Sequence, residues 1–470
     1  MKIFLSLILN ILIFQIYAIE INDFDSSPIA GTVEAPVAEP QNPQEINETE
    51  EVKEFAIQKK LLIDVSDIFY KVYIRCYYID KNSRKASINY LWGRTPDNQY
   101  AVIKGSWYEN TRLWNNVYYT EASDIELKQT CRNVLEFAGF SENDFNKIFV
   151  NYTAAMWSTS YDTNFWSDIR IPTFNGFSRI VVLGDSASDV HNMFDKMYWL
   201  LPNQEGYFHG RFSNGPVMVE YLAKILNLPL EVVAEGGAEI KGEGSQGFVA
   251  KSLLEQFQLY KGFIDNLPPG YTNDVNKTLF IVFIGGNDFN QQTDPTNDVS
   301  ILINNYLFVI NKLVDMGANH IIVPVFPDIS LFPDVAARIK ENYLGQKTLD
   351  LQIENFNKGI ELGLEKFNDK TKYPNLHIYR PNFDDMINKS RLSGAFKNLT
   401  SKCSSAGYTN SPTINTVCSE PLDYFMWDGM HPSTKAHCMW ANAIAEFLAL
   451  QLGVQININA NCEYNYVHVK

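Results

Sequence analysis

The sequence predicts an α/β domain at residues 176–470, with a parallel sheet between two layers of helices, and a smaller β-rich domain before it at 55–175. Two observations predict the larger domain. Short, nearly continuous apolar runs recur along it, and amphipathic helical patterns separate them. Strands of a parallel sheet are buried on both faces, so their sequences are apolar throughout. We expect these strands at 179–184, 230–235, 278–286, 320–327 and 376–380.

The N-terminus carries two segments outside both predicted domains. Residues 1–18 form an apolar run after one lysine and end on Ala18, which is typical of a secretory signal peptide. The alternative, an uncleaved membrane anchor, is disfavoured because the run is short for a membrane span. Residues 19–54 contain ten acidic residues, one basic residue and four prolines, which predicts a disordered acidic leader. We therefore expect a protein that is secreted or delivered to a lumenal compartment.

The predicted β-rich domain at 55–175 is unusually aromatic. Residues 70–79, YKVYIRCYYI, alternate as a strand does, and residues 100–120 contain further strand-like pieces separated by Gly and Asn turns. We favour a core role for these aromatic side chains because such residues supply much of the buried area in proteins. The alternative is that the exposed part of this domain contacts a membrane surface, since Trp and Tyr prefer that interface.

The first strand of the larger domain, RIVVLG at 179–184, runs directly into Asp185 and Ser186. In open parallel sheets, functional sites gather outside the carboxyl ends of the strands. A serine hydroxyl is a poor nucleophile until a base removes its proton, and a third group has to hold that base. Ser186 is therefore a candidate nucleophile that needs a histidine and a carboxylate from elsewhere in the chain.

The next two apolar strands end in groups that could stabilise a developing oxyanion. Gly236 and Gly237 follow the predicted strand at 230–235, and either can present a backbone N–H that no side chain covers. The side-chain amide of Asn287 follows the predicted strand at 278–286. The backbone N–H of Ser186 is a third donor, and each donor of this kind contributes about 3 kcal/mol. Helical patterns follow at 252–267 and 301–317.

His431 is the favoured base among the seven histidines. It lies in WDGMHPS, and Asp428 precedes it by three residues, so its carboxylate can hold one imidazole nitrogen while the other faces the nucleophile. His191 ranks second because only Asp189 and Asp195 are near it in sequence. His320 and His377 lie in apolar strand patterns and are interpreted as core residues.

Six cysteines in a chain with an export signal predict disulfides. We favour the pairs Cys76–Cys131, Cys403–Cys418 and Cys438–Cys462. No cysteine has the paired spacing of a zinc site, and neither a metal nor a cofactor is expected. The run GEGSQG at 242–247 matches a dinucleotide fingerprint in letters, but it does not follow its strand directly, so we reject that function. Sequons for glycosylation occur at Asn47, Asn151, Asn276, Asn388 and Asn398.

Four blocks in order, GDSASD, the glycine after the second strand, GGND and DGMHPS, resemble the conserved blocks of the GDSL, or SGNH, family of lipases and esterases. The run at 210–223 is similar to its lipase branch, which includes thermolabile haemolysins and glycerophospholipid:cholesterol acyltransferases. The resemblance covers about residues 60–450 and implies a flavodoxin-like three-layer hydrolase domain that needs no metal. It implies that Ser186 is the nucleophile, that Asp428 and His431 complete the triad, and that Ser186, Gly237 and Asn287 form the oxyanion hole.

The sequence departs from the family pattern at two positions. Ala187 replaces the leucine of the family name, and a smaller side chain there widens the floor of the pocket. Val232 stands where the second block usually has Asn, which weakens the choice of Gly237 over Gly236. The G-x-S-x-G elbow of α/β-hydrolases does not occur around Ser186, which argues against that fold.

These observations predict a secreted serine esterase or lipase that hydrolyses acyl esters, foremost phospholipids. The reaction passes through an acyl-serine, and a sterol is a further possible acceptor of the acyl group. We expect a monomer that touches membrane surfaces peripherally. The net charge of −15 argues against nucleic acid as a partner. Two alternatives stay open: a carbohydrate acetylesterase of the same fold, and a lipid-binding toxin or adhesin with an incidental catalytic shell.

Overall fold

The computed structural model describes residues 71–78, 90–109, 116–156, 160–167, 174–204, 206–241, 250–291, 298–341, 345–408, 417–458 and 462. The predicted signal peptide and acidic leader lie outside these residues, as does the glycine-rich run at 242–247. The described residues belong to one unit of the chain, Glu34–Lys470.

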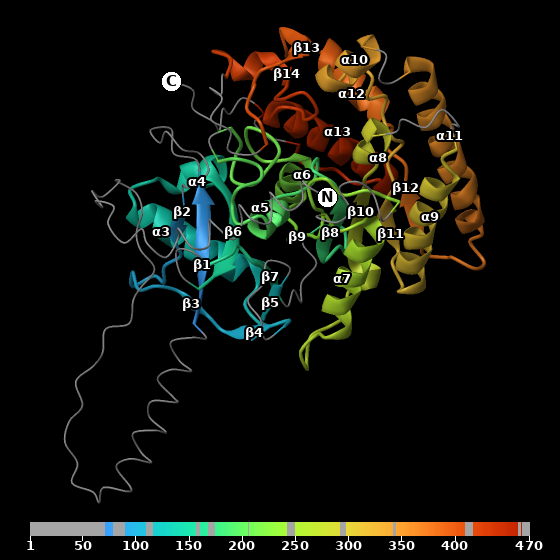
Figure 1. Cartoon of the computed structure of the whole chain (residues 1–470). Coiled ribbons are helices and arrows are strands. Elements are labelled where there is room, and N and C mark those ends of the chain that lie inside the picture. The colour runs from blue at the N-terminus through green and yellow to red at the C-terminus, as the bar shows by residue number, and fades with distance from the viewer. Residues whose placement is uncertain are drawn as a thin grey trace, which may run out of the picture. The chain divides into compact units, whose positions relative to one another are not determined.

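A five-stranded parallel sheet forms the centre of the larger predicted domain (Figure 1). Its strands are β8 Arg179–Gly184, β9 Leu230–Val232, β10 Thr278–Phe283, β11 His320–Ile322 and β12 His377–Tyr379. They lie in the order β12-β11-β10-β8-β9, which is the flavodoxin-like arrangement with its switch point between β8 and β10. Every residue of β8 and β10 is buried, as their continuous apolar sequences predict. The predicted fold class is confirmed.

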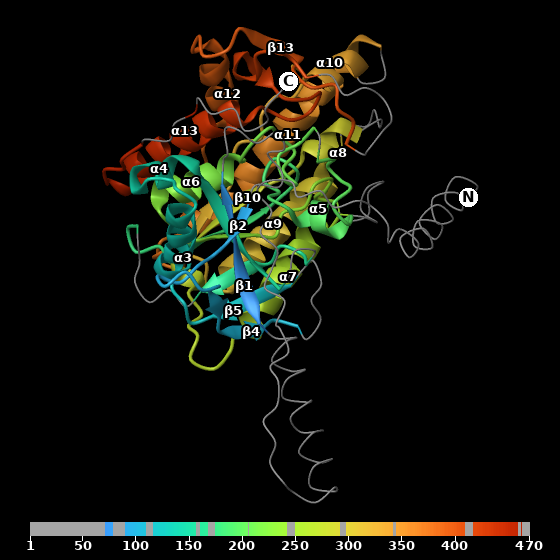
Figure 2. The same cartoon turned by 90° about the vertical axis from the view of Figure 1, so that its left-hand side faces the viewer.

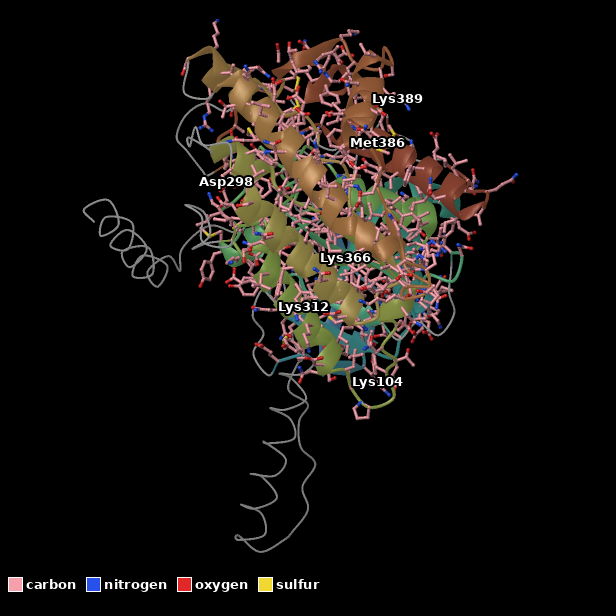
Figure 3. All side chains as sticks on the ribbon, turned by 90° about the vertical axis from the view of Figure 1, so that its right-hand side faces the viewer. Lys104, Asp298, Lys312, Lys366, Met386 and Lys389 are labelled. Atoms are coloured by element: carbon pink, nitrogen blue, oxygen red, sulfur yellow. A yellow bond between two sulfur atoms is a disulfide. The ribbon has the colours of Figure 1, made fainter. Side chains whose placement is uncertain are left out.

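Two groups of helices cover the sheet (Figure 2). One group packs together as α7 Leu253–Asp265, α9 Ser300–Asp315 and α11 Gln346–Leu364, and the other as α6 Met218–Leu226, α12 Phe383–Leu392 and α13 Thr434–Leu452. Short helices follow the strand ends, namely α5 Asn192–Lys196, α8 Gly286–Gln291 and α10 Pro333–Lys340. Helix α9 ends just before Gly317, whose φ of 98° suits a glycine terminator. Charged side chains such as Lys312 and Lys366 point outward from the α9 and α11 layer (Figure 3).

The described residues of the N-terminal region form two small sheets and two helices. Strand β1 (Val72–Tyr78) pairs antiparallel with β2 (Tyr90–Trp92), β3 (Val102–Ile103) and β6 (Phe149–Ala155). The second sheet consists of β4 Gly105–Trp107, β5 Val117–Thr120 and β7 Asn164–Ser167. The β-rich pattern predicts no helix here, yet α3 (Asp124–Phe137) and α4 (Glu142–Ile148) lie between β5 and β6. The capping box of Ser123 and Glu126 at the start of α3 was the available signal.

Most of the described aromatic side chains of this region lie in its core, as we expect from the sequence. Tyr73, Trp92, Tyr118 and Trp166 are all buried. The region also contacts the larger domain, because the Tyr119 hydroxyl donates to the Phe263 carbonyl at 2.7 Å. One apolar core cluster includes residues from both sides of the proposed boundary after residue 175, which itself stays a prediction.

The three predicted disulfides are confirmed. Cys76–Cys131 joins β1 to α3, Cys403–Cys418 closes a local loop, and Cys438–Cys462 ties α13 to the chain beyond it. Within the described residues, no helix combines the length and the hydropathy that a membrane span requires.

Candidate active site

Ser186 lies just beyond the carboxyl end of β8, at the switch point of the sheet. The Ser188 and Asp189 backbone N–H groups both donate to the Asp185 carbonyl at 3.0 Å, which forms a tight turn after the strand. The Asp185 carboxylate accepts the Ala187 N–H at 3.1 Å. This turn leaves the Ser186 side chain half-buried at the position that the sequence predicts.

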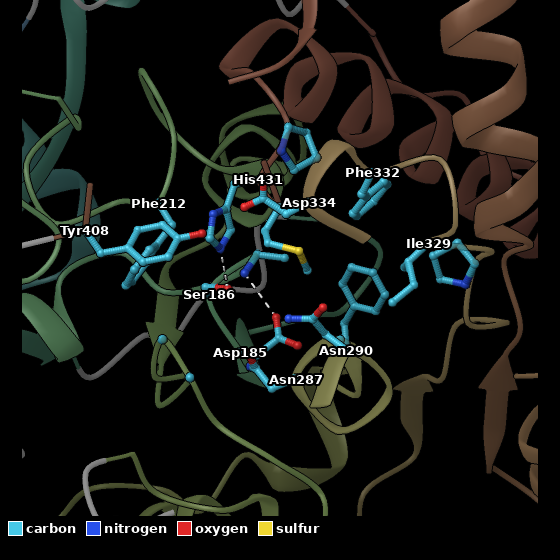
Figure 4. Close-up of a pocket in the computed structure, with 18 of the residues that line it drawn as sticks. Asp185, Ser186, Phe212, Asn287, Asn290, Ile329, Phe332, Asp334, Tyr408 and His431 are labelled. Carbon is cyan, nitrogen blue, oxygen red and sulfur yellow. Dashed lines mark hydrogen bonds between the residues drawn. The ribbon is translucent and has the colours of Figure 1, made fainter. Parts of the chain in front are cut away.

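Ser186, His431 and Asp428 form a continuous line of hydrogen bonds, and Figure 4 shows the one between Ser186 and His431. The His431 Nε2 atom lies 2.8 Å from the Ser186 Oγ atom, and the His431 Nδ1 atom lies 2.8 Å from Asp428 Oδ2. Three residues from two strand-end loops, separated by 245 positions between serine and histidine, therefore meet as the sequence predicts. This geometry lets a base receive the serine proton while a carboxylate holds its tautomer.

The Asp428 carboxylate is buried and accepts hydrogen bonds at both oxygens. Its Oδ1 atom accepts the backbone N–H groups of Met430 and His431, each at 2.7 Å, and its Oδ2 atom accepts the Tyr207 hydroxyl at 2.7 Å. Burial alone would raise the pKa of Asp428, but the His431 imidazole and these hydrogen bonds hold it below its usual value. The carboxylate is thus ionised and fixed in place.

No pattern in the sequence points to Tyr207 as a partner of Asp428. Burial and the neighbouring Asp428 raise the pKa of the Tyr207 phenol far above its usual value, so it is a neutral donor. Its loop is attached to the histidine loop, because the Trp427 indole N–H donates to the Gly206 carbonyl at 2.9 Å. Within the Tyr207 loop, the Gly206 N–H donates to the Asn203 side chain at 2.8 Å. No spacing rule could have found a partner 221 positions away in an irregular loop.

Asp334 supports the opposite side of the histidine loop. Its backbone N–H donates to the Gly429 carbonyl at 3.0 Å, and its carboxylate lies against the Gly429 Cα (Figure 4). A Cβ atom at position 429 would overlap that carboxylate. Position 429 therefore has to be glycine, because the Asp334 side chain leaves no room for a Cβ atom.

We expect Gly429→Ala to lower kcat/KM on a p-nitrophenyl ester by about tenfold or more, because the added methyl pushes the loop that carries Asp428 and His431. Asp334→Ala should restore much of the loss when it is combined with Gly429→Ala, since it removes the overlapping carboxylate. Steady-state kinetics of the single and double variants measure this. An unchanged kcat/KM in Gly429→Ala would contradict the steric explanation.

The structure distinguishes the two glycines of the second strand end. The Gly236 N–H already donates to the Asp189 carboxylate at 2.7 Å. Among the described residues, none accepts a hydrogen bond from the Gly237 N–H, and both glycines line the cavity at Ser186. The geometry therefore favours Gly237 over Gly236 as an oxyanion donor. The Asn287 side chain also lines this cavity and donates to the Ala238 carbonyl at 2.9 Å.

Two buried acids hold the strand-end loops together, a role that the sequence pattern does not predict. Asp288 accepts the backbone N–H groups of Ile240 at 2.9 Å and Lys241 at 3.3 Å, which joins the loops after β9 and β10. Asp189 accepts the N–H of Asn192 at 2.7 Å in addition to that of Gly236. Burial raises the pKa of Asp288 to about 7 and that of Asp189 to about 6. Both carboxylates help to set the positions of Gly237 and Asn287.

Among the described residues, no histidine other than His431 pairs with Ser186. The His191 ring lies 3.2 Å from Asp195 and 3.2 Å from the Asn164 side chain, so the second-ranked base has other partners. The His320 ring lies 3.0 Å from the Tyr379 hydroxyl and stacks on His377. The core interpretation is wrong for His377, which is exposed on the edge strand β12.

Ser186 and His431 line a cavity of about 420 Å³ whose remaining walls are mostly apolar (Figure 4). Ala187 lies among the lining residues, in agreement with a pocket floor left open by a small side chain. The apolar walls include Phe212, Phe283, Phe326, Ile329, Phe332, Met430 and Trp440. Within the described part of the chain, no group of three or more His, Cys, Asp or Glu side chains could hold a metal ion.

A flavodoxin-like domain with a serine, a histidine and an aspartate in hydrogen-bonded series defines a class of protein, the serine-dependent ester hydrolases. The chain belongs to the GDSL-like lipase/acylhydrolase family, whose model it matches over residues 180–444. Residues 38–168 match a second model, described as the N-terminal domain of Vibrio dual lipase/transferase. The predicted family is therefore confirmed.

Several relatives resemble this chain at low identity. A thermolabile hemolysin of Vibrio parahaemolyticus is 26% identical over 389 residues, which is 80% of this chain and 87% of the hemolysin. A phosphatidylcholine-sterol acyltransferase of Aeromonas hydrophila is 25% identical over 58% of this chain and 91% of its own length. A secreted effector protein of Salmonella typhimurium is 26% identical over 58% of this chain and 64% of its own length. Among solved structures, a lipolytic G-D-S-L family member of Veillonella parvula aligns with 57% of this chain and 97% of its own, at 14% identity and a TM-score of 0.31.

Proposed function

We propose that this protein is a secreted phospholipase that can also transfer the acyl group to a sterol. The contact that carries the proposal is the 2.8 Å approach of His431 Nε2 to Ser186 Oγ at the end of an apolar cavity. The similarity to a hemolysin and to a phosphatidylcholine-sterol acyltransferase supports the choice of substrate and acceptor. The three disulfides support secretion, because such bonds persist in oxidising compartments.

In this proposal, His431 takes the Ser186 proton while the Ser186 Oγ attacks the ester carbonyl. The N–H groups of Ser186 and Gly237 and the amide of Asn287 donate to the oxygen that becomes negative. His431 then gives the proton to the departing alcohol and leaves an acyl-serine. Water or a sterol hydroxyl attacks this intermediate in a second round that uses the same residues. Asp428 keeps the imidazole in the required tautomer throughout.

Product analysis by mass spectrometry tests the proposal. The protein is incubated with vesicles of phosphatidylcholine and cholesterol, and lysolipid, free fatty acid and cholesteryl ester are measured for the wild type and for Ser186→Ala. A phospholipase releases lysolipid and fatty acid, and a transferase adds cholesteryl ester. Rates along a ladder of p-nitrophenyl esters separate the acetylesterase alternative, because that enzyme would fail beyond acetate. Full membrane activity in Ser186→Ala would favour the toxin or adhesin alternative.

We expect Asn287→Ala to lower kcat by about 10²-fold to 10³-fold with little change in KM. One amide N–H donates to the Ala238 carbonyl, and in this proposal the other donates to the charge that develops in the transition state. Asn290→Ala is the matched control, since Asn290 lines the same cavity but contacts Arg338. Saturation kinetics of both variants on p-nitrophenyl butyrate measure the difference. Equal losses in the two variants would refute the oxyanion role of Asn287.

We also propose that membrane contact occurs around the mouth of the cavity, where Tyr198 and Leu200 are 71% and 53% exposed close in sequence to the lining residue Leu201. Replacing both Tyr198 and Leu200 with serine should reduce the fraction bound to phosphatidylcholine vesicles by about tenfold in a sedimentation assay, because their apolar area no longer enters the interface. Leu392→Ser is the control, since Leu392 is 81% exposed on α12. Equal binding of the double variant and the control would rule out this surface.

A further inference from the structure

A second cavity, of about 240 Å³, lies between the N-terminal region and the larger domain. Its walls come from α3, from the segment of α4 and β6, and from α6 with the loop that leads to β9. Helices α3, α4 and α6 lie close together in Figure 2. It shares no lining residue with the cavity at Ser186. The function proposed above gives it no role.

The walls of this second cavity are of two kinds. The side formed by α3 and α6 carries three cations, Lys128, Arg132 and Lys224. The apolar part of the lining includes Phe145, Phe149, Phe165, Leu228 and Leu230. A cationic rim over an apolar wall matches a molecule with an anionic head and a hydrocarbon chain.

The two acids of this cavity already have cationic partners. The Asp124 carboxylate lies 2.7 Å from Lys128 Nζ and also accepts the Tyr152 hydroxyl. The Glu220 carboxylate lies 2.5 Å from an Arg211 nitrogen, and Arg211 is not a lining residue. The lining of this cavity therefore carries more positive than negative charge, although the net charge of the chain is −15.

Lys224 and Lys128 stand close enough to repel each other. The Lys224 Nζ atom lies 3.5 Å from the Phe149 carbonyl. Desolvation at the cavity wall, followed by the positive charge of Lys128, lowers the pKa of Lys224 to about 8. The Arg132 guanidinium lies over the Phe145 ring at 4.2 Å, and its ion pair with Glu142 is long at 3.9 Å. An anion placed between these cations relieves their repulsion.

We propose that this cavity is a binding site for a fatty-acid anion, with the carboxylate between Lys128 and Lys224 and the chain along Phe149 and Leu230. The proposal rests on the ester-hydrolase activity only for the origin of the ligand, since hydrolysis of an acyl ester releases this anion. Arg132 supports the head through its planar donors. The site lies outside the catalytic machinery, so ligand binding does not require a reactive serine.

The test uses the full chain with Ser186→Ala and decanoate as the probe. Hydrogen–deuterium exchange followed by mass spectrometry should show slower exchange in peptides of α3 and α6 when decanoate is added. The double change Lys128→Gln and Lys224→Gln should remove this protection and raise the Kd measured by calorimetry at least about tenfold, because it removes both charged partners of the carboxylate. The double change Lys312→Gln and Lys366→Gln, on the outer surface shown in Figure 3, is the matched control and should keep the protection.

Further measurements distinguish failure of this binding site from failure of the proposed function. Decanol lacks the charge and should protect α3 and α6 much less than decanoate does. Esterase rates of the Lys128 and Lys224 double variant, made with Ser186 intact, should stay within about twofold of wild type, which also verifies folding. Protection confined to peptides around Ser186, or equal protection in the lysine variant, would overturn the site. An inactive wild-type esterase would instead overturn the proposed function and leave the binding result intact.

Discussion

Ser186→Ala is expected to lower kcat/KM for ester hydrolysis by about 10⁴-fold or more. The Ser186 hydroxyl is the atom that His431 approaches at 2.8 Å, and alanine leaves the imidazole with no proton to receive. Hydrolysis of p-nitrophenyl butyrate and release of fatty acid from phosphatidylcholine vesicles measure the loss. Both rates should fall together because one nucleophile serves both substrates.

Ser188→Ala is the matched control for this experiment. Ser188 lies two residues further along the same turn and is fully buried, and within the described residues its hydroxyl has no hydrogen-bond partner. Its removal should change stability and rate only slightly, because no hydrogen bond is lost. If Ser186→Ala kept a rate within tenfold of Ser188→Ala, the nucleophile would have to be another group.

The parts of the site that follow apolar strands could be predicted from the sequence. The ends of β8 and β10 are fixed by continuous apolar runs, and a parallel sheet brings such ends to one edge. Ser186 and Asn287 therefore had to be neighbours once the fold class was known. The other two groups of the triad, the base and the carboxylate, follow from the spacing of Asp428 and His431. Three residues on a short turn place the carboxylate beside the imidazole.

The parts that depend on loop packing could not be predicted. Tyr207 reaches the histidine loop from an irregular segment, and Asp334 reaches it from the first turn of α10. No hydrophobic period in the sequence indicates either contact. The choice between Gly236 and Gly237 depended on which N–H the Asp189 carboxylate accepts, and that is a tertiary contact. The exposure of His377 follows from the position of β12 at the edge of the sheet, which an apolar pattern alone does not show.

Asp428→Asn is expected to lower kcat by about 10³-fold to 10⁴-fold while the protein stays folded. The Asp428 carboxylate accepts the His431 Nδ1–H at one oxygen and two backbone N–H groups at the other. Asparagine has one oxygen, and the backbone donors of Met430 and His431 will hold it. The amide N–H₂ then faces Nδ1 and favours the tautomer with the proton on Nε2. That tautomer cannot accept the Ser186 proton.

Tyr207→Phe separates this tautomer effect from simple positioning. It removes one of the donors to Asp428 but leaves the carboxylate and both backbone donors in place. We expect about a tenfold loss in kcat with an unchanged KM, since the imidazole keeps its tautomer and only the orientation of the carboxylate loosens. Circular dichroism and steady-state kinetics of the two variants test this order. A Tyr207→Phe loss as large as that of Asp428→Asn would mean that the position of the carboxylate, rather than its ability to accept from Nδ1, limits the reaction.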